Sequence, residues 1–128
     1  MNFNKAQLGA IEHKDGAMLV LAGPGSGKTA VITHRTKNLI TKHHVKPSEI
    51  LVITFTKAAA NEMKERFNSL MKDERVNVSF GTFHAVFFTI LKYAYRFTSA
   101  NIADESVRYG FIREILSYYR LEYKQFTC

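Results

Sequence analysis

The sequence has very little cysteine, and this scarcity excludes two classes of small protein. Its 128 residues include a single cysteine, Cys128. One thiol cannot build a disulfide framework within the chain or a cysteine-based metal site. The five histidines lack the spacing to acidic or cysteine partners that a zinc site requires. We therefore expect no metal that is held by protein side chains alone.

Long uninterrupted apolar segments are also missing. A membrane-spanning helix needs about 20 consecutive apolar residues, and no segment of this chain is that long. Residues 1–5 lack the apolar core of a signal peptide. Hydrophobic residues nevertheless make up 46% of the chain, which indicates a folded segment and argues against disorder. We expect a cytoplasmic protein with no membrane partner.

Acidic residues are outnumbered. The chain has 18 lysines and arginines against 11 aspartates and glutamates, which gives a formal net charge of +7. This balance favours a polyanionic partner such as nucleic acid, although a generic basic surface would give the same count. Charge alone leaves the partner open.

A glycine-rich loop after an apolar run is the most specific pattern in the chain. Residues 22–29 read Ala-Gly-Pro-Gly-Ser-Gly-Lys-Thr and directly follow the apolar run 17–21. This matches the phosphate-binding pattern of P-loop proteins, with Ala22 where the strict pattern has glycine. Glycines can take the positive φ values that turn backbone N–H groups around an anion. A turn that only links a strand to a helix would not require this spacing.

The residues of this loop predict a complete cradle for a nucleoside triphosphate with Mg²⁺. A helix that begins near Lys28 adds free N–H groups and the positive end of its dipole. The Lys28 ammonium is suited to the β- and γ-phosphates, and the Thr29 hydroxyl is suited to Mg²⁺. We predict that the nucleotide is bound by Ala22, Gly23, Pro24, Gly25, Ser26, Gly27, Lys28 and Thr29, with Lys28 and Thr29 in the catalytic roles.

Strand and helix patterns alternate along the chain. The expected strands are 17–21, 50–53 and 76–80, and the expected helices are 4–13, with Asn4 as N-cap, 28–42, one after the second strand, 83–95 and 104–119. Short connections between alternating elements indicate an α/β fold with a parallel sheet of three strands flanked by helices. We expect the helix 28–42 to bury Val31, Ile32, Leu39 and Ile40. The helix after the second strand should place on one face, at three- and four-residue spacing, Ala59, Ala60, Met63, Phe67, Leu70 and Met71. We expect the very apolar helix 83–95 to be buried nearly all round, and the helix 104–119 to turn Val107, Phe111, Ile112, Ile115, Leu116 and Tyr119 inward.

Three further blocks carry a resemblance to a known family. Residues 3–7, Phe-Asn-Lys-Ala-Gln, resemble its Q motif, and residues 53–66 resemble its motif Ia. Residues 81–85, Gly-Thr-Phe-His-Ala, resemble its Thr-Phe-His-Ser block. Together with the glycine loop, these blocks make roughly residues 3–120 similar to the N-terminal part of superfamily 1 DNA helicases of the UvrD/Rep/PcrA type.

The resemblance implies a fold and a division of the chain. The fold would be a partial RecA-like P-loop domain, with residues 1–97 as its ATP-binding part and residues 98–128 as the start of a helical sub-domain. The cofactors would be ATP and Mg²⁺. The partners would be single-stranded and duplex DNA, together with a second RecA-like domain in the remainder of a helicase chain.

The resemblance also implies roles for individual residues. Gln7 would read adenine with its amide, and Arg35 would lie near the nucleotide, whereas Ala30 stands where relatives often carry an arginine. For DNA, the contacts would come from Phe55, Thr56, Lys57, Thr82 and His84. Phe55 offers a face for base stacking, and the others offer donors to phosphate. Asn61 and Ala85 depart from the family pattern, which often has a basic residue and a serine there.

The chain lacks a second acidic motif, which such a helicase needs to hold Mg²⁺ and position the attacking water. Its two Asp-Glu pairs are Asp73-Glu74, in a polar stretch, and Asp104-Glu105, which we interpret as the charged start of a helix. We expect this chain to be an amino-terminal fragment of an ATP-dependent 3′–5′ DNA helicase that translocates on single strands. Two alternatives stay open: a nucleotide-binding module without turnover, and a small P-loop kinase or GTPase.

Overall fold

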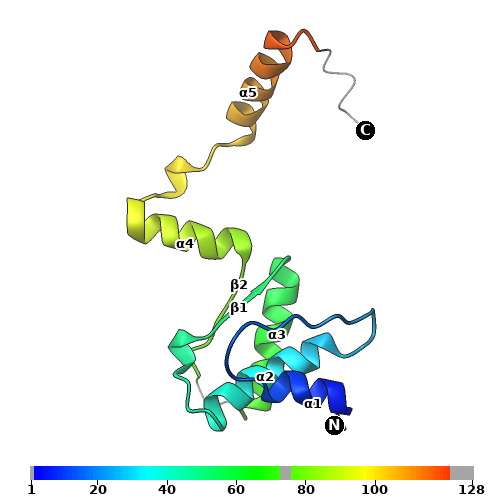
Figure 1. The fold of residues 1–128 in the computed structure, drawn as a ribbon. Coiled ribbons are helices and arrows are strands. Elements are labelled where there is room, and N and C mark those ends of the chain that lie inside the picture. The colour runs from blue at the N-terminus through cyan, green and yellow to red at the C-terminus, as the bar shows by residue number, and fades with distance from the viewer. Residues whose placement is uncertain (1, 73–75, 122–128) are drawn as a thin grey trace. The chain divides into compact units, whose positions relative to one another are not determined.

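The computed structural model describes residues 2–72 and 76–121. The described residues contain helices, strands and two short 3₁₀ turns, η1 (Pro47–Glu49) and η2 (Ser99–Asn101) (Figure 1). The helices and strands are α1 (Lys5–Glu12), α2 (Lys28–Thr41), β1 (Leu51–Thr54), α3 (Lys57–Leu70), β2 (Ser79–Thr82), α4 (Phe83–Tyr95) and α5 (Glu105–Tyr118).

The chain divides into two compact units between Phe87 and Phe88. The α/β class is confirmed, and the division into residues 1–97 and 98–128 stays a prediction.

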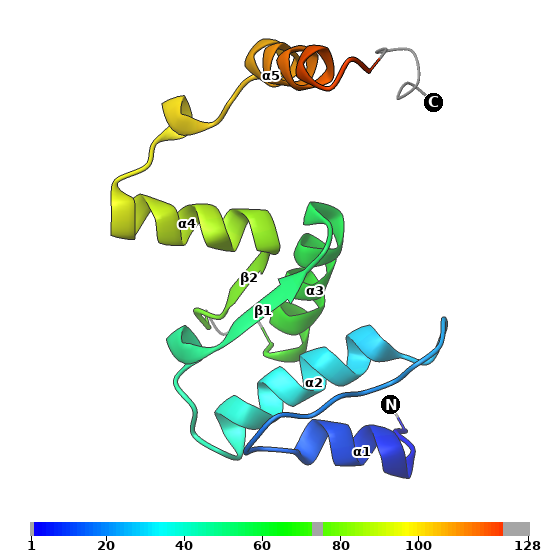
Figure 2. The same cartoon turned by 45° about the horizontal axis from the view of Figure 1, so that its top comes forward.

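The sheet of the first unit is parallel, as predicted. β1 pairs with β2 in a register that sets Leu51 opposite Ser79 and Thr54 opposite Thr82. The two strands start one and three residues later than the sequence indicated. α3 connects them and packs against both, and α2 packs against α3 (Figure 2). The carboxyl ends of both strands therefore lie at one edge of the sheet.

One of the three predicted strands, residues 17–21, does not form. This segment is an unpaired connection between α1 and the glycine loop (Figure 2), and Leu19 and Leu21 are 84% and 88% exposed. A strand needs a neighbour that exchanges backbone hydrogen bonds with it, but β1 and β2, the strands of the described part of the chain, pair only with each other. The prediction was wrong because an apolar run favours burial without supplying a pairing partner.

The core of the first unit is centred on one face of α3. Phe67 is fully buried, and Ile50, Met71 and Val78 pack around it. The Phe67 and Phe80 rings lie 5.5 Å apart between centroids. The three- and four-residue spacing of apolar residues predicted this face of α3 correctly. The core thus attaches α3 to the sheet.

Side-chain hydrogen bonds fasten α1 to α2. Arg35 Nη1 donates to Ala10 O at 2.8 Å, and Asn38 Nδ2 donates to Ile11 O at 3.1 Å. The Phe3 and His34 rings meet edge to face, with centroids 4.7 Å apart. Burial and the neighbouring Lys37 ammonium lower the pKa of His34, which favours the neutral imidazole at this contact. The position of α1 is therefore set by α2.

The apolar surfaces of α4 and α5 are not buried as the sequence indicated. α4 has no buried residue, and of the α5 residues predicted to point inward, Phe111 and Ile115 are 61% and 55% exposed. Leu116 is half-buried, and the other three, Val107, Ile112 and Tyr119, are exposed. Apolar spacing shows which face of a helix favours burial, but burial itself requires another element to cover that face. The burial predicted nearly all round α4 and the inward orientation predicted for the apolar residues of α5 were both wrong.

Asp104 caps the first turn of α5. Its Oδ1 accepts hydrogen bonds from Val107 N at 2.9 Å and from Ser106 Oγ at 2.7 Å. The bond from the Val107 N–H, followed by that from the Ser106 hydroxyl, lowers the pKa of Asp104. The interpretation of Asp104-Glu105 as the start of a helix is confirmed, whereas Asp73-Glu74 lies outside the described residues.

This cap predicts a pH dependence of α5. The carboxylate favours the helix above the ordinary aspartate pKa of about 3.9, and we expect its contribution to be lost as the pH falls through the lower pKa in the folded chain. The Val107 amide resonance should follow this titration. Asp104→Asn keeps a capping side chain without a titrating group, so a Val107 shift that persisted unchanged in this variant would contradict the assignment.

Candidate functional site

The glycine loop has the backbone conformation that an anion cradle requires. Gly25 and Gly27 have φ values of 72° and 77°, in the left-handed region that glycine tolerates best. Ser26 stabilises the turn, because its Oγ donates to Gly23 O at 2.7 Å and its N–H donates to the same oxygen at 3.4 Å. The conformation of the loop is thus stabilised by hydrogen bonds between its own residues.

The N-terminus of α2 adds donors to the loop. Gly27 is the N-cap residue and makes no side-chain capping bond, which leaves the first N–H groups of the helix without an intrahelical or capping partner. The Thr29 hydroxyl makes no hydrogen bond within the described part of the chain. A free hydroxyl and uncapped N–H groups are the donor and ligand set that a Mg²⁺-bound phosphate needs.

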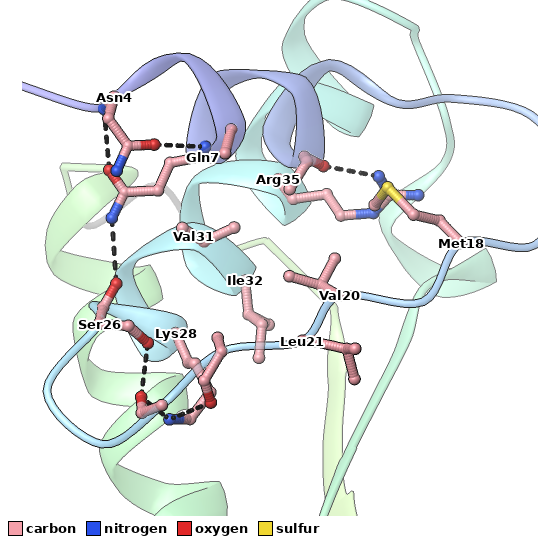
Figure 3. A pocket seen from close by; sticks show the side chains of 14 residues that line it. Asn4, Gln7, Met18, Val20, Leu21, Ser26, Lys28, Val31, Ile32 and Arg35 are labelled. Atoms are coloured by element: carbon pink, nitrogen blue, oxygen red, sulfur yellow. Dashed lines mark hydrogen bonds between the residues drawn. The ribbon is translucent and has the colours of Figure 1, made fainter.

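The Lys28 side chain is folded back onto the loop. Its Nζ donates to Gly23 O at 2.7 Å and to Ala22 O at 3.3 Å (Figure 3). Both acceptors are neutral backbone carbonyls, which bind an ammonium group less strongly than phosphate oxygens do. Lys28 therefore already lies at the loop and can exchange these carbonyls for an anion.

A cavity of about 420 Å³ opens beside the loop. Its size falls within the range of small-molecule sites. Apolar walls come from Val20 and Leu21 in the unpaired segment and from Val31 and Ile32 in α2 (Figure 3). Its polar and charged lining residues are Asn4, Gln7, Ser26, Lys28 and Arg35. Such a lining suits a ligand with one apolar, planar part and one anionic part.

The cavity brings together most of the residues predicted for the nucleotide. Its lining includes Gln7, Ala22, Gly23, Ser26, Lys28 and Arg35. Pro24, Gly25, Gly27 and Thr29 belong to the same loop and helix start but do not line the cavity. The roles assigned to these ten residues stay predictions. Arg35 lines the cavity while its guanidinium donates a hydrogen bond to the Ala10 carbonyl.

Asn4 is a lining residue that we did not predict from the sequence. Its Oδ1 accepts from Gln7 N, and Gln7 Oε1 accepts from Asn4 N, both at 2.9 Å. This reciprocal pair is a capping box, and the Asn-x-x-Gln spacing before a helix was a signal for it. Asn4 was recognised as the N-cap of the helix, but its effect on the orientation of Gln7 was missed.

The five residues predicted to contact DNA lie at the carboxyl edge of the sheet. Thr54 and Thr82 are paired across the ends of β1 and β2, so the residues that follow them in the chain start from the same edge. Phe55 is 86% exposed, and Lys57 and His84 are exposed in the first turns of α3 and α4. This edge is where α/β sheets usually bind ligands.

Thr56 and Thr82 at this edge also cap the helices that start there. Thr56 Oγ1 accepts from Ala59 N and Thr82 Oγ1 accepts from Ala85 N, each at 3.2 Å. Each hydroxyl keeps its own O–H for donation. The two residues are therefore able to cap a helix and donate to a phosphate together.

Two other kinds of feature are absent from residues 2–72 and 76–121. In this part of the chain, no three or more histidine, cysteine, aspartate or glutamate side chains are grouped so that they would hold a metal ion. None of the described helices combines the length and hydropathy needed to cross a membrane.

Comparisons with known proteins place the chain in one family. Residues 3–126 match the UvrD/REP helicase N-terminal domain. The chain is 51% identical over 81 residues to ATP-dependent DNA helicase SRS2 of Saccharomyces cerevisiae, covering 61% of this chain and 7% of that protein. It is 45% identical over 89 residues to ATP-dependent DNA helicase PcrA of Bacillus subtilis, covering 70% and 12%. For PcrA of Staphylococcus aureus the identity is 42% over 91 residues, covering 71% and 12%.

Proposed function

The chain belongs to the family of UvrD/REP helicase N-terminal domains, and from this membership we propose that it binds ATP with Mg²⁺ at the glycine loop and single-stranded DNA at the carboxyl edge of β1 and β2. The observation that carries the nucleotide part is the geometry around Lys28. Positive φ values at Gly25 and Gly27, an uncapped helix start and a lysine ammonium converge on one loop. Each of these features favours an anion.

The cavity and the glycine loop beside it have separate roles in this proposal. The loop N–H groups and Lys28 bind the phosphates, and the Thr29 hydroxyl ligates Mg²⁺. Val20, Leu21, Val31 and Ile32 cover the faces of the base, and Gln7 reads its edge. Mg²⁺ supplies neutralisation of phosphate charge, while the side chains of this chain hold and orient the ligand.

For the whole protein we propose an ATP-dependent DNA helicase with 3′–5′ polarity that translocates on single strands. The chain spans 7% and 12% of the length of the relatives SRS2 and PcrA. The nucleotide would lie between this RecA-like part and a second RecA-like domain, whose residues complete the catalytic machinery. Within the 128 residues, the missing acidic motif favours binding without turnover, which is the second function that we consider.

A calorimetric titration of the chain with ATP tests the nucleotide proposal. We expect saturable binding of one ATP per chain when Mg²⁺ is present and weaker binding when it is omitted, because Thr29 then has no metal to ligate. An absence of ATP binding to the folded chain would contradict the proposal. A preference for GTP would favour the alternative of a GTPase.

Phe55→Ala is expected to weaken binding of a single-stranded oligonucleotide. Stacking of one base on an aromatic side chain contributes about 1–3 kcal/mol, so affinity should fall by about 5- to 150-fold. Fluorescence anisotropy with a labelled oligonucleotide at two salt concentrations measures the change. Tyr93→Ala is the matched control, since Tyr93 is not one of the five residues predicted to contact DNA and is 86% exposed, as Phe55 is. Equal affinities for the two variants would exclude a stacking role for Phe55.

A further inference from the structure

The Gln7 amide is bonded at both of its ends. Nε2 donates to Ser26 O at 3.0 Å, across 19 residues of sequence, and Oε1 accepts from Asn4 N at 2.9 Å (Figure 3). A carbonyl partner requires a donor and an N–H partner requires an acceptor, so the two neighbours together fix which end of the amide is nitrogen. Gln7 therefore connects the N-terminus of α1 to the glycine loop.

The bond to Ser26 acts on the part of the loop that binds an anion. In a trans peptide, the carbonyl oxygen and the N–H of the next residue point to opposite sides. Holding Ser26 O toward Gln7 consequently directs the Gly27 N–H away from Gln7. The Gly27 N–H has no hydrogen-bond acceptor among the described residues, and it belongs to the backbone donors with which such loops surround phosphate. Gln7 thus sets the orientation of one phosphate donor.

The contact between Gln7 and the loop is close. A Cβ added at Gly27 would lie 3.4 Å from Gln7 Nε2, and the left-handed φ of 77° at Gly27 would strain any side chain there. The Gln7 amide therefore lies directly against the loop, at a residue where the backbone conformation itself favours glycine.

Gln7 also retains hydrogen-bonding capacity for a base. An amide has two N–H groups and two carbonyl lone pairs, and one of each is used by Ser26 and Asn4. The remaining N–H and lone pair have no partner in the described part of the chain. Together they match one donor and one acceptor on an adenine edge.

We propose that Gln7 is a positioning residue of the glycine loop, which orients the Gly27 N–H through the Ser26 carbonyl, in addition to any contact that it makes with the base. Base recognition and phosphate binding then pass through one side chain. This inference rests on the proposed function, since it concerns the same nucleotide site. It differs in its consequence, because a residue that only reads the base has no effect on a ligand without a base.

Magnesium tripolyphosphate, which has phosphates and no base, separates the two roles. We expect Gln7→Met, which keeps the length of the side chain and introduces no charge, to weaken tripolyphosphate binding by about two- to tenfold, as for the loss of one neutral hydrogen bond. The affinity for ATP should fall by at least the same factor. Calorimetry with both ligands measures the two changes.

Asn38→Leu is the matched control. Asn38 also donates a side-chain amide N–H to a backbone carbonyl between α1 and α2, at 3.1 Å to Ile11 O, but it is not a residue of the cavity. This variant should bind tripolyphosphate as the wild-type chain does. An equal loss in both variants would show that loosening of α1 is the cause and would overturn the proposal.

The other outcomes of the two titrations distinguish failure of this inference from failure of the proposed function. If Gln7→Met binds ATP more weakly but tripolyphosphate with unchanged affinity, Gln7 only reads the base and the inference is wrong. If the wild-type chain binds neither ligand, the proposed function itself fails. Should Gln7→Met lose helix content, the wild-type chain still gives an answer by NMR. The Gln7 side-chain NH₂ resonances should shift when tripolyphosphate is added, and unchanged resonances at saturation would overturn the inference.

Discussion

Replacement of Lys28 with alanine is expected to weaken Mg-ATP binding by about 10- to 150-fold. The ammonium group now bonds the carbonyls of Ala22 and Gly23, and a phosphate would be a stronger acceptor for it. Hydrogen bonds to charged groups contribute about 1.5–3 kcal/mol, and 1.4 kcal/mol corresponds to tenfold in affinity. The other cation of the cavity, Arg35, is bonded to Ala10 O of α1 and does not replace Lys28.

Calorimetry on Lys28→Ala and on Lys42→Ala measures this effect with a matched control. Lys42 lies at the opposite end of α2 and pairs with Glu12 at 3.6 Å. It carries the same charge but is remote from the loop along the helix. Affinities reduced equally in both variants would mean that general charge, and not the position of Lys28, holds the nucleotide. ATP turnover is a separate readout, and we expect none above the Lys28→Ala level for the 128 residues alone.

Phe67→Ala is expected to have the largest effect on stability. Phe67 has no exposed surface and packs in the cluster with Ile50, Met71 and Val78. Truncation of a buried phenylalanine costs about 3–5 kcal/mol, whereas a typical domain is stable by only about 5–15 kcal/mol. Urea unfolding followed by circular dichroism should show a much lower midpoint. Nucleotide binding should be lost with it, because α2, which carries Lys28, packs against α3.

The exposed Phe55 provides the control for this loss of stability. Its side chain is 86% exposed, so Phe55→Ala should change the free energy of unfolding by less than about 0.5 kcal/mol. The two phenylalanines thus separate stability from DNA binding, since one variant should be much less stable and the other should only bind DNA less tightly. A small destabilisation in Phe67→Ala would show that the core of the first unit does not depend on this ring.

The elements predicted well from the sequence are those whose signals are local. The start of α1 follows from the capping residue Asn4, and α3 follows from apolar spacing around Phe67. Residues 17–21 failed because pairing of a strand depends on a partner elsewhere in the chain. α4 and α5 formed as helices, but their burial was predicted wrongly because it depends on a covering element. Local patterns thus predicted where helices and strands form better than they predicted which of these elements are paired or buried.

The same distinction applies to the candidate site. Gly25, Gly27 and Lys28 were recognisable because a phosphate loop is contiguous in the sequence. The bond from Gln7 to Ser26 O joins residues 19 positions apart, and no local pattern predicts such a contact. The apolar walls from Val31 and Ile32 were likewise expected in the core and instead line the cavity.

The most direct test of this account is an NMR titration of the isotope-labelled chain with Mg-ATP. We predict that the largest shifts fall on the backbone amides of Gly25, Gly27, Lys28 and Thr29, with saturation at one nucleotide per chain. Shifts that instead cluster on exposed basic residues away from the loop, such as Lys42 and Lys46, or no shifts at all, would contradict the assignment of the glycine loop as the nucleotide site.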